Sequence, residues 1–293
     1  MYLCLEVIVI ERDILSPREN IPEGIKRQVR QKDGFGCCKC GNPIVQYHHI
    51  VPRSENPEEI MLLCPLHHDE ATSKAMTFEE QLYWKQNPVN ITSGRVVGIL
   101  KINQSRPIIS IGSVQFIGDS DIILVDDESL LSVNMDSSAS YDNFERLTIS
   151  ARLYDSHDKL LAVIENNEWI LGDPKPWDII AKWQYLKISS GTGDIAIEIN
   201  AKSDPITIKG NLWRKKQHIL LSNCVFFISG VINNSSICEL CLVGMRIVMD
   251  TILNQCRIEP NPKIGKAVLV SESNRKKRIR KGLKAWKELN KKF

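Results

Sequence analysis

Two histidine doublets lie beside paired cysteines in the first quarter of the chain. His48-His49 follows a Cys-x-x-Cys pair, and His67-His68 completes a Cys-x-x-His pair. Two such pairs supply the four soft or borderline donors that a closed tetrahedral zinc site requires. The spacing therefore predicts a structural zinc ion (Zn2+) held by Cys37, Cys40, Cys64 and His67.

Three histidines, His48, His49 and His68, are left over once the zinc ligands are assigned. A purely structural zinc site has no use for them. Imidazole is the commonest metal ligand and titrates near neutral pH, so it can also take a proton from water. The surplus histidines therefore predict a second metal ion and a general base, the two groups that metal-assisted hydrolysis uses.

Three segments of this region resemble the HNH, or ββα-metal, nuclease family. They are residues 36–41 (GCCKCG), 45–53 (VQYHHIVPR) and 61–72 (MLLCPLHHDEAT), and the similarity extends over about residues 22–94, a quarter of the chain. In that family the His-His-Ile segment lies on a β-hairpin and the last histidine on the following helix. The resemblance implies a zinc-stapled nuclease domain that cuts nucleic acid, with DNA the favoured substrate.

The resemblance also implies a role for each surplus histidine. Carried over by position, His48 and His68 bind one catalytic divalent metal (Mg2+, Mn2+, Ni2+ or Zn2+), and His49 is the general base. Successive residues of a strand face opposite sides. We therefore expect a bulge or twist in the hairpin if His48 and His49 both face the substrate. Pro65 suits a first helical position, which places His68 in the first turn of a helix.

One position departs from the family. The asparagine that normally stands five residues before the cysteine at Cys64 is here Glu59. In the family that asparagine braces the hairpin loop by hydrogen bonds. We assign Glu59 the same role in the catalytic site, as an acceptor only, and Asn56 lies close enough in sequence to substitute for it.

Two other functions stay open at this point. The first is a catalytically inactive zinc-knuckle protein that binds nucleic acid or protein, with the β-rich part of the chain doing the recognition. The second is a nuclease held within a larger complex, such as a bacterial defence effector, which fits a nuclease fused to a β-rich module of no recognised family. Metal-dependent nicking of a plasmid by pure protein distinguishes an enzyme from a scaffold.

Length and composition are those of a globular intracellular protein. The 293 residues predict about two domains. The apolar fraction of 43% and the charged fraction of 25% allow a sizeable core. The apolar run at residues 2–10 is too short to span a bilayer and lacks the features of a signal peptide, so we expect a strand that docks on the nuclease domain or on a partner. Nine cysteines, several in one metal cluster, favour a reducing, cytoplasmic compartment and no membrane partner.

The charge of the chain is concentrated at its C-terminal end. Residues 275–293 hold ten Lys or Arg and one acid, a charge of +9, whereas the rest of the chain has 28 basic and 34 acidic residues, a charge of −6. Ile279, Leu283, Trp286 and Leu289 recur along one side of a helix. A basic tail that tethers an acidic nuclease body to nucleic acid is the favoured interpretation. The predicted contacts are Arg275, Lys276, Lys277, Arg278, Arg280, Lys281 and Lys284. A solvated tail and docking to an acidic partner are the alternatives.

The fold class expected is α+β. We predict an N-terminal extension at residues 1–20, the HNH domain at 21–94, a β-rich domain at 95–265 and the basic helical tail at 266–293. A helix begins near Pro22 and ends near Gly34, and Thr77 and Glu80 form a capping box that opens another. Residues 87–94 are expected to form a linker.

Beyond residue 95 the pattern changes to short β-branched segments separated by Gly, Asn, Asp and Ser, which predicts a sandwich-like or barrel-like domain. Residues 148–172 and 207–230 match at an offset of about 58, which indicates a duplicated unit. This domain is assigned to specificity, sensing, or docking to a protein partner or a second copy. Its tryptophans are expected to pack the core, and the Cys238-x-x-Cys241 pair to be inert buried thiols.

Overall fold

The structure, a computed structural model, describes residues 21–103, 108–118, 120–136, 146–171, 176–222, 226–229, 235–237, 240–243, 245–251, 255–260, 267–271 and 274–290. The strand predicted at residues 2–10 lies outside these ranges, as does Cys238. The described chain is a mixed α+β protein in which most regular structure is in β-sheets. No helix of these ranges is both long enough and apolar enough to cross a membrane.

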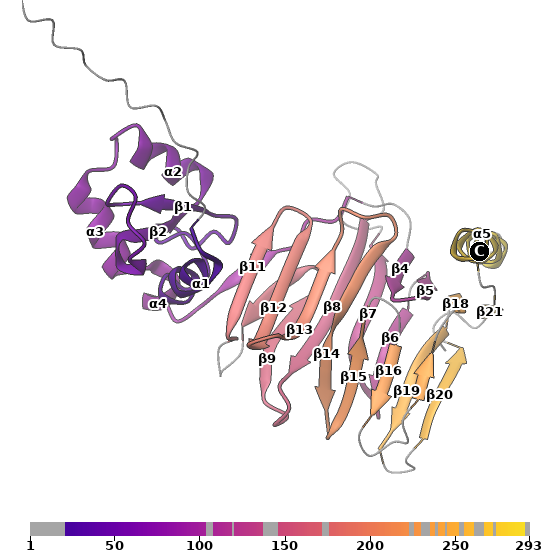
Figure 1. Cartoon of the computed structure of the whole chain (residues 1–293). Helices are drawn as coiled ribbons and strands as arrows, with labels where there is room; N and C mark the ends of the chain where they lie inside the picture. Colours follow the sequence, from indigo (N-terminus) through magenta and orange to yellow (C-terminus); the bar gives the residue numbers. More distant parts are fainter. Residues whose placement is uncertain are drawn as a thin grey trace, which may run out of the picture.

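Helices gather at the two ends of the chain. They are α1 (Glu23–Lys32), η1 (Pro57–Glu59, a 3-10 turn), α2 (Pro65–Thr72), α3 (Phe78–Gln86), α4 (Val89–Thr92) and α5 (Arg275–Asn290). Residues 21–94, here called the N-terminal unit, contain all of them except α5 (Figure 1). This unit also holds the antiparallel pair β1 (Gln46–His49) and β2 (Ile60–Leu63).

The helix boundaries follow local signals in the sequence. Pro22 caps α1, Pro65 is the first residue of α2, and the capping box of Thr77 and Glu80 opens α3 as predicted. Each signal satisfies or avoids a backbone N–H that a first turn would leave without a partner. The helices could therefore be predicted from short stretches of sequence.

The N-terminal unit is held by a small core and one buried ion pair. All four side chains of β2 are buried, and they pack toward α1 on one side and toward the cysteine knuckle on the other. Asp33, at the end of α1, accepts hydrogen bonds from the backbone N–H of Leu62 (2.7 Å) and from Lys85 Nζ (2.6 Å). One buried carboxylate thus ties together α1, β2 and α3.

Residues 87–94 do not form the linker that was expected. They include α4, and Asn90 is buried, with its side-chain amide donating to the carbonyl oxygens of Gly34 (2.9 Å) and Gly41 (3.2 Å). A Cβ at position 41 would lie 2.4 Å from the Asn90 side chain, which explains why this position is a glycine. The prediction was wrong because Asn90 binds carbonyl groups about 50 residues earlier, which no local pattern reveals.

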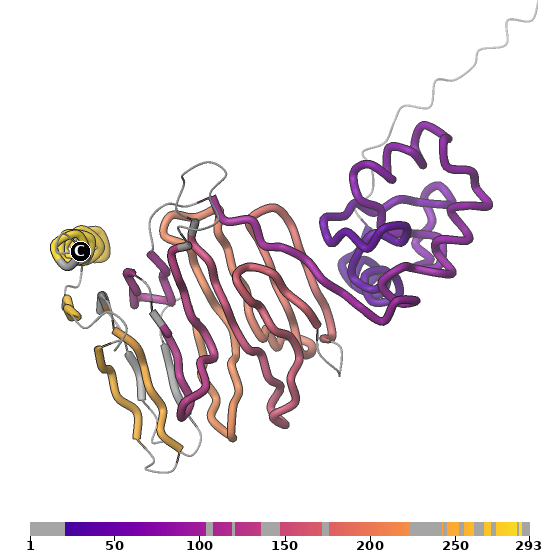
Figure 2. The backbone as a smooth tube through the Cα atoms, turned by 180° about the vertical axis from the view of Figure 1, so that it is seen from behind, coloured from indigo at the N-terminus to yellow at the C-terminus, as the bar shows by residue number. Residues whose placement is uncertain are grey.

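The strands from residue 97 onward, here called the β unit, form two large sheets (Figures 1 and 2). They are β3 (Val97–Ile99), β4 (Ile108–Ile111), β5 (Val114–Ile117), β6 (Ser120–Val125), β7 (Glu128–Asp136), β8 (Arg146–Tyr154), β9 (Leu160–Glu165), β10 (Glu168–Leu171), β11 (Asp178–Lys182), β12 (Tyr185–Gly191), β13 (Asp194–Asn200), β14 (Ile206–Arg214), β15 (Gln217–Leu221), β16 (Phe226–Ser229), β17 (Ser235–Ile237), β18 (Leu240–Val243), β19 (Met245–Asp250), β20 (Gln255–Pro260) and β21 (Val268–Ser271).

Both sheets consist mainly of antiparallel meanders. One sheet has the order β20-β19-β6-β7-β8-β9-β10-β3, and the other has the order β11-β12-β13-β14-β4-β5-β18-β21, with β15, β16 and β17 branching from β14. Parallel pairs join β14 to β4, β18 to β5 and β19 to β6. These three pairs connect segments that lie far apart in the sequence.

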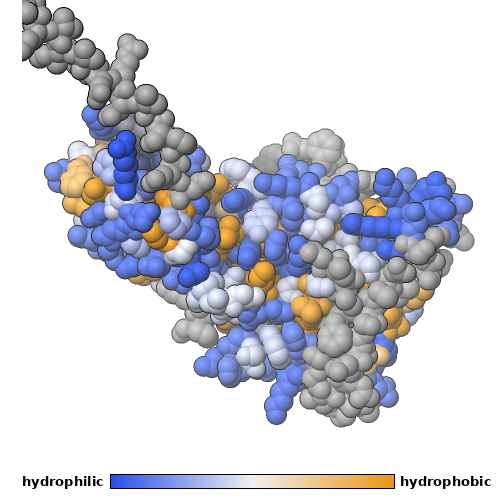
Figure 3. All heavy atoms as spheres, viewed as in Figure 1, coloured by the Kyte–Doolittle hydropathy of each residue, from blue (hydrophilic) through white to orange (hydrophobic). Residues whose placement is uncertain are grey.

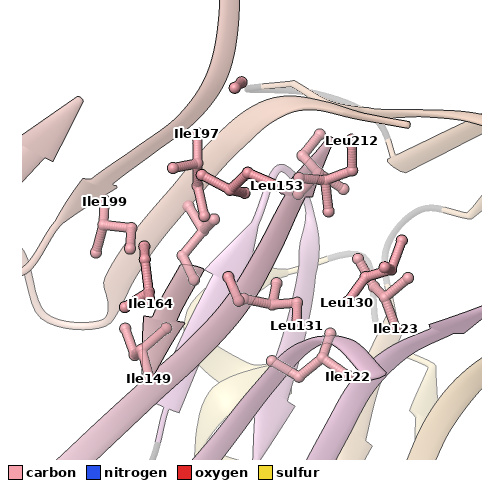
Figure 4. Close-up of a cluster of buried hydrophobic side chains, with 14 of the residues drawn as sticks. Ile122, Ile123, Leu130, Leu131, Ile149, Leu153, Ile164, Ile197, Ile199 and Leu212 are labelled. Carbon is pink, nitrogen blue, oxygen red and sulfur yellow. The ribbon is translucent and has the colours of Figure 1, made fainter. Parts of the chain in front are cut away.

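The core of the β unit lies between the two sheets. Strands of both sheets alternate buried and more exposed residues, and their inward side chains form one apolar cluster, in which Leu131, Leu153, Ile197 and Leu212 face one another (Figure 4). Burial of each such side chain contributes about 1.5–3 kcal/mol. Trp169 belongs to this cluster and is 1% exposed, whereas Trp183 is 54% exposed. The packing role predicted for the tryptophans therefore holds for Trp169 and not for Trp183.

The two segments that match in sequence lie on comparable strands of different sheets. β8 and β14 each span nine residues, and each is followed by a hairpin partner along the chain, β9 or β15. The sequence duplication stays a prediction. It concerns the hairpin of β8 and β9 and the hairpin of β14 and β15.

The N-terminal unit is fixed to the edge strand β11. Arg30 of α1 donates from Nε and Nη2 to the two carboxylate oxygens of Asp178, at 2.8 and 2.7 Å, and both side chains are buried. Beside this pair, Gln31 donates to the carbonyl oxygen of Trp177, and the Arg27 guanidinium lies 4.2 Å from the centroid of the Trp177 ring. The guanidinium of Arg30 also donates to the hydroxyl of Tyr47 on β1 (2.6 Å). The interface therefore reaches the hairpin directly.

Candidate metal and catalytic centre

Four predicted ligands converge between the knuckle after α1 and the start of α2. Cys37 and Cys40 lie on a tight turn closed by the N–H of Gly41 donating to the carbonyl of Cys37 (2.7 Å), and Gly41 takes a φ of +75° that favours glycine. Cys64 is the residue before α2, and His67 lies in its first turn. The end of β2 and the proline start of α2 thus fix the second ligand pair.

The geometry of the four ligands fits a tetrahedral zinc ion. One ligand atom from each of Cys37, Cys40, Cys64 and His67 lies within 4.8 Å of all the others. The Cys40 and Cys64 sulfurs are 3.8 Å apart, and His67 Nδ1 lies 3.2 Å from Cys37 Sγ and 3.3 Å from Cys64 Sγ. Zn–S and Zn–N bonds at tetrahedral angles place two sulfurs about 3.8 Å apart, and a sulfur and a nitrogen about 3.5 Å apart. These residues could therefore hold zinc.

Zinc binding at this cluster would expel protons. Burial raises the pKa of the Cys37 thiol, and burial raises the pKa of Cys40 to about 12. Both thiols are therefore protonated in the metal-free chain at neutral pH, whereas a zinc ligand must be a thiolate. Affinity for zinc at this site accordingly weakens as the pH falls.

Two of the surplus histidines form a pair beside the cluster of Cys37, Cys40, Cys64 and His67. His48 on β1 and His68 on α2 meet edge to face, with ring centroids 5.3 Å apart and an interplanar angle of 87°. His68 follows His67 of that cluster, so the fold of the cluster sets its position. Burial lowers the pKa of His48. This keeps its imidazole neutral at neutral pH, as a metal ligand must be.

Gln81 of α3 is a third member of this group, and no motif in the sequence pointed to it. Its Oε1 lies 3.1 Å from His48 Nε2, and its Nε2 donates to the carbonyl of Met76 (3.2 Å). Because a carbonyl only accepts, the amide must present its oxygen to the imidazole. His48 Nε2 is then the protonated nitrogen, which leaves Nδ1 of His48 with the lone pair that a metal requires.

His49 occupies the last position of β1 and pairs with Ile60 in a regular register. The expected bulge is absent from β1–β2, so alternation directs His48 and His49 to opposite sides of the strand. His49 Nε2 is buried and has no hydrogen-bond partner within the described ranges. A buried imidazole nitrogen without a partner is costly in a protein that uses it only for packing.

Glu59 closes the loop between the two strands. Its carboxylate accepts a hydrogen bond from the Ser54 hydroxyl, and its backbone carbonyl accepts one from the N–H of Ile50 (2.9 Å). Glu59 thus has the acceptor geometry expected of a brace. Asn56 does not substitute for it, because its side chain caps η1 by accepting from the N–H of Glu58 (3.1 Å).

The predicted nucleic-acid contacts of the tail lie on α5, apart from the N-terminal unit (Figure 1). Arg278 is only 2% exposed, and its Nε donates to Gln115 Oε1 (2.7 Å). Its assignment as a nucleic-acid contact was therefore wrong. The other six cations of that prediction are exposed. The tail is also shorter than predicted, because β21 is a strand of the sheet.

Comparison of the chain with protein-family models, with curated proteins and with solved structures gave no match.

Proposed function

We propose that this protein is a metal-dependent endonuclease of the HNH type that hydrolyses phosphodiester bonds, most favourably those of DNA. The observation that carries the proposal is the pairing of His48 with His68 directly beside a cluster that could hold zinc. The buried Nε2 of His49, which has no partner in the described part of the chain, supports the presence of a base. The β unit would serve specificity, sensing or docking into a larger assembly.

The chain supplies three functions to this reaction. His48 and His68 would hold one divalent cation, with Gln81 fixing the tautomer of His48. That cation, when bound, would stabilise charge on the phosphate and on the departing oxygen. His49 would take the proton of the attacking water, and for this the end of β1 must twist, because its regular register leaves His49 on the opposite side of the strand from His48. The Cys3His cluster would hold α2 against the hairpin and thereby keep His68 opposite His48.

The alternative function is a zinc-knuckle scaffold that binds without cutting. Incubation of pure protein with supercoiled plasmid, and separately with single-stranded DNA and RNA, in Mg2+, Mn2+, Ni2+ or Zn2+ decides between the two. We expect metal-dependent nicking that stops in EDTA. No cleavage of any substrate with any of the four metals would reject the enzyme and favour the scaffold.

Glu59 provides a test of the hairpin loop. Because its carboxylate accepts from Ser54, Glu59→Ala should lower the nicking rate, whereas Glu59→Asn retains an acceptor and should leave or raise it. Glu55→Ala, at an exposed position of the same loop, is the matched control. Equal rates for Glu59→Ala and wild type would show that the carboxylate braces nothing that matters to catalysis.

Gln81 provides a test of the metal ligands. Gln81→Leu removes the group that holds His48 in one tautomer, so we expect the affinity for the catalytic metal to fall about 10–100-fold, the usual effect of losing such a hydrogen bond. Calorimetric titration with Mn2+ or Ni2+ and the metal concentration for half-maximal nicking measure it. Gln86→Leu, at an exposed position of α3, is the control. An unchanged metal affinity in Gln81→Leu would contradict the assignment.

A further inference from the structure

The basic helix α5 is a docked element with a defined inward face. Ile279 and Leu283 pack against Ile108 and Ile117 of the sheet. Asn274 caps the helix by accepting from the N–H of Lys277 (3.1 Å). The helix therefore has the tertiary contacts that a solvated tail would lack.

Arg278 fixes the rotation of α5. Its guanidinium donates to Gln115 Oε1 (2.7 Å) and to the carbonyl of Ser113 (2.8 Å), and Gln115 is fully buried. Because Arg278 points into the sheet with Ile279, the residues on the other sides of the helix are presented outward. These contacts hold the outward side chains in one direction.

The exposed side chains described on α5 are almost all cationic. Its exposed basic residues are Arg275, Lys276, Lys277, Arg280, Lys281, Lys284 and Lys287. Glu288 is the one acid of the helix, and it pairs with Lys284 at 3.9 Å. Figure 3 shows hydrophilic residues at this end of the molecule. This is the composition of a phosphate-binding surface.

The chemistry of this surface favours nucleic acid over a protein partner. Stable protein interfaces have an apolar core and are depleted of lysine. The apolar side chains Ile279 and Leu283 of α5 already face the sheet, and no large apolar side chain described on α5 is exposed. Phosphate groups need no apolar contact, and each binds a Lys or Arg directly.

This surface lies at the opposite end of the molecule from the candidate catalytic centre (Figures 1 and 2). The N-terminal unit docks on β11, and α5 contacts β5, β18 and β21. In the sheet order, β11 and β21 are separated by seven strand spacings. At about 4.8 Å each, these two strands alone lie about 34 Å apart, which is a lower bound on the distance between the two surfaces. A B-form duplex needs about ten base pairs to cover that length, at ~3.4 Å each.

We propose that α5 is a second nucleic-acid-binding surface, which contacts the phosphates of a duplex that also reaches the histidine pair. The choice of ligand rests on the proposed nuclease function. A duplex is stiff over this length, with a persistence length of about 150 base pairs, so it can bridge both surfaces without a large bending cost. The preferred substrate is accordingly a long duplex, and a short one reaches only one surface at a time.

Binding of duplex DNA by full-length His49→Ala protein tests the surface without cleavage. The α5 variant adds four substitutions to this protein, Lys276→Gln, Lys277→Gln, Arg280→Gln and Lys287→Gln. All four positions are exposed, so Arg278 and the apolar face of α5 stay intact. The control removes the same charge from exposed cations of the β unit by Arg152→Gln, Lys159→Gln, Lys202→Gln and Lys216→Gln. Equal melting temperatures confirm that both sets are folded.

With a duplex of about 40 base pairs, the slope of log K against log salt should become shallower by up to about 3.6 in the α5 variant, because each lost phosphate contact removes about 0.9. The control should not change it. A slope change no larger than that of the control would overturn the assignment of α5 as a nucleic-acid-binding surface. It would favour docking of α5 to an acidic protein partner, or a helix that is only solvated.

Duplex length tests the bridging. Without the α5 substitutions, the protein should bind the duplex of about 40 base pairs at least about tenfold more tightly per site than a hairpin stem of about 8 base pairs, which is shorter than the span. The α5 variant should lose that difference. Equal affinities for both lengths in the protein with intact α5 overturn two-surface binding. Absence of plasmid nicking by the wild type would instead reject the nuclease, and the binding result would stand.

Discussion

Replacement of His49 by alanine is expected to abolish plasmid nicking while zinc content and thermal stability stay at wild-type values. A positioned general base contributes about 10²–10⁴-fold to a rate. Its removal has no structural cost of the same size, because His49 Nε2 makes no hydrogen bond within the described ranges. The nicking rate, the zinc per chain from elemental analysis, and the melting temperature measure the three quantities.

His157→Ala is the matched control, because this histidine is an exposed one on a turn of the β unit with a side chain 81% accessible. It should nick DNA at the wild-type rate. If His49→Ala cuts normally, the general base is a different group and the positional assignment from the family is wrong.

Replacement of Cys64 by alanine is expected to unfold the N-terminal unit. Apparent zinc-binding free energies in small zinc domains are about 10 kcal/mol or more. That is comparable to the whole stability of a domain. Cys64 also stands between β2 and α2, so loss of the ion releases His67 and His68 together. Soluble yield, the melting curve and zinc per chain should all fall.

Cys256→Ala provides the control, because this partly buried free cysteine lies on β20 of the β unit. It should retain zinc and melt close to the wild type. A Cys64→Ala protein that keeps one zinc per chain and the wild-type melting curve would refute the structural role of the cluster.

Features that depend on residues close together in the sequence could be predicted for this molecule. The Cys3His cluster was predicted from spacing, because the two residues of each pair lie only three positions apart in the sequence. The helix starts were predicted from Thr77 and Pro65, because a cap acts within four residues. The β-rich character of the chain beyond residue 95 was predicted from its short β-branched segments, because such residues suit a pleated, half-buried surface.

Contacts between distant segments could not be predicted in this way. The parallel pairs such as β14 with β4 depend on how whole meanders stack. In the sequence Gln81 does not differ from other polar helix residues, and only the packing of α3 places it against His48. Arg278 was assigned to the solvent side because it is charged, although it shares a helix face with Ile279, and only the presence of Gln115 and Ser113 in the sheet makes its burial tolerable.

The contact of Arg30 with both Asp178 and Tyr47 limits how freely the N-terminal unit could be exchanged as a module. Tyr47 precedes His48 on β1, so one guanidinium joins the β unit to the strand that bears the histidines. Transplanted alone, the unit would carry a cation whose main carboxylate partner stays behind. A grafted N-terminal unit would therefore need an aspartate at the position of Asp178 in its new host.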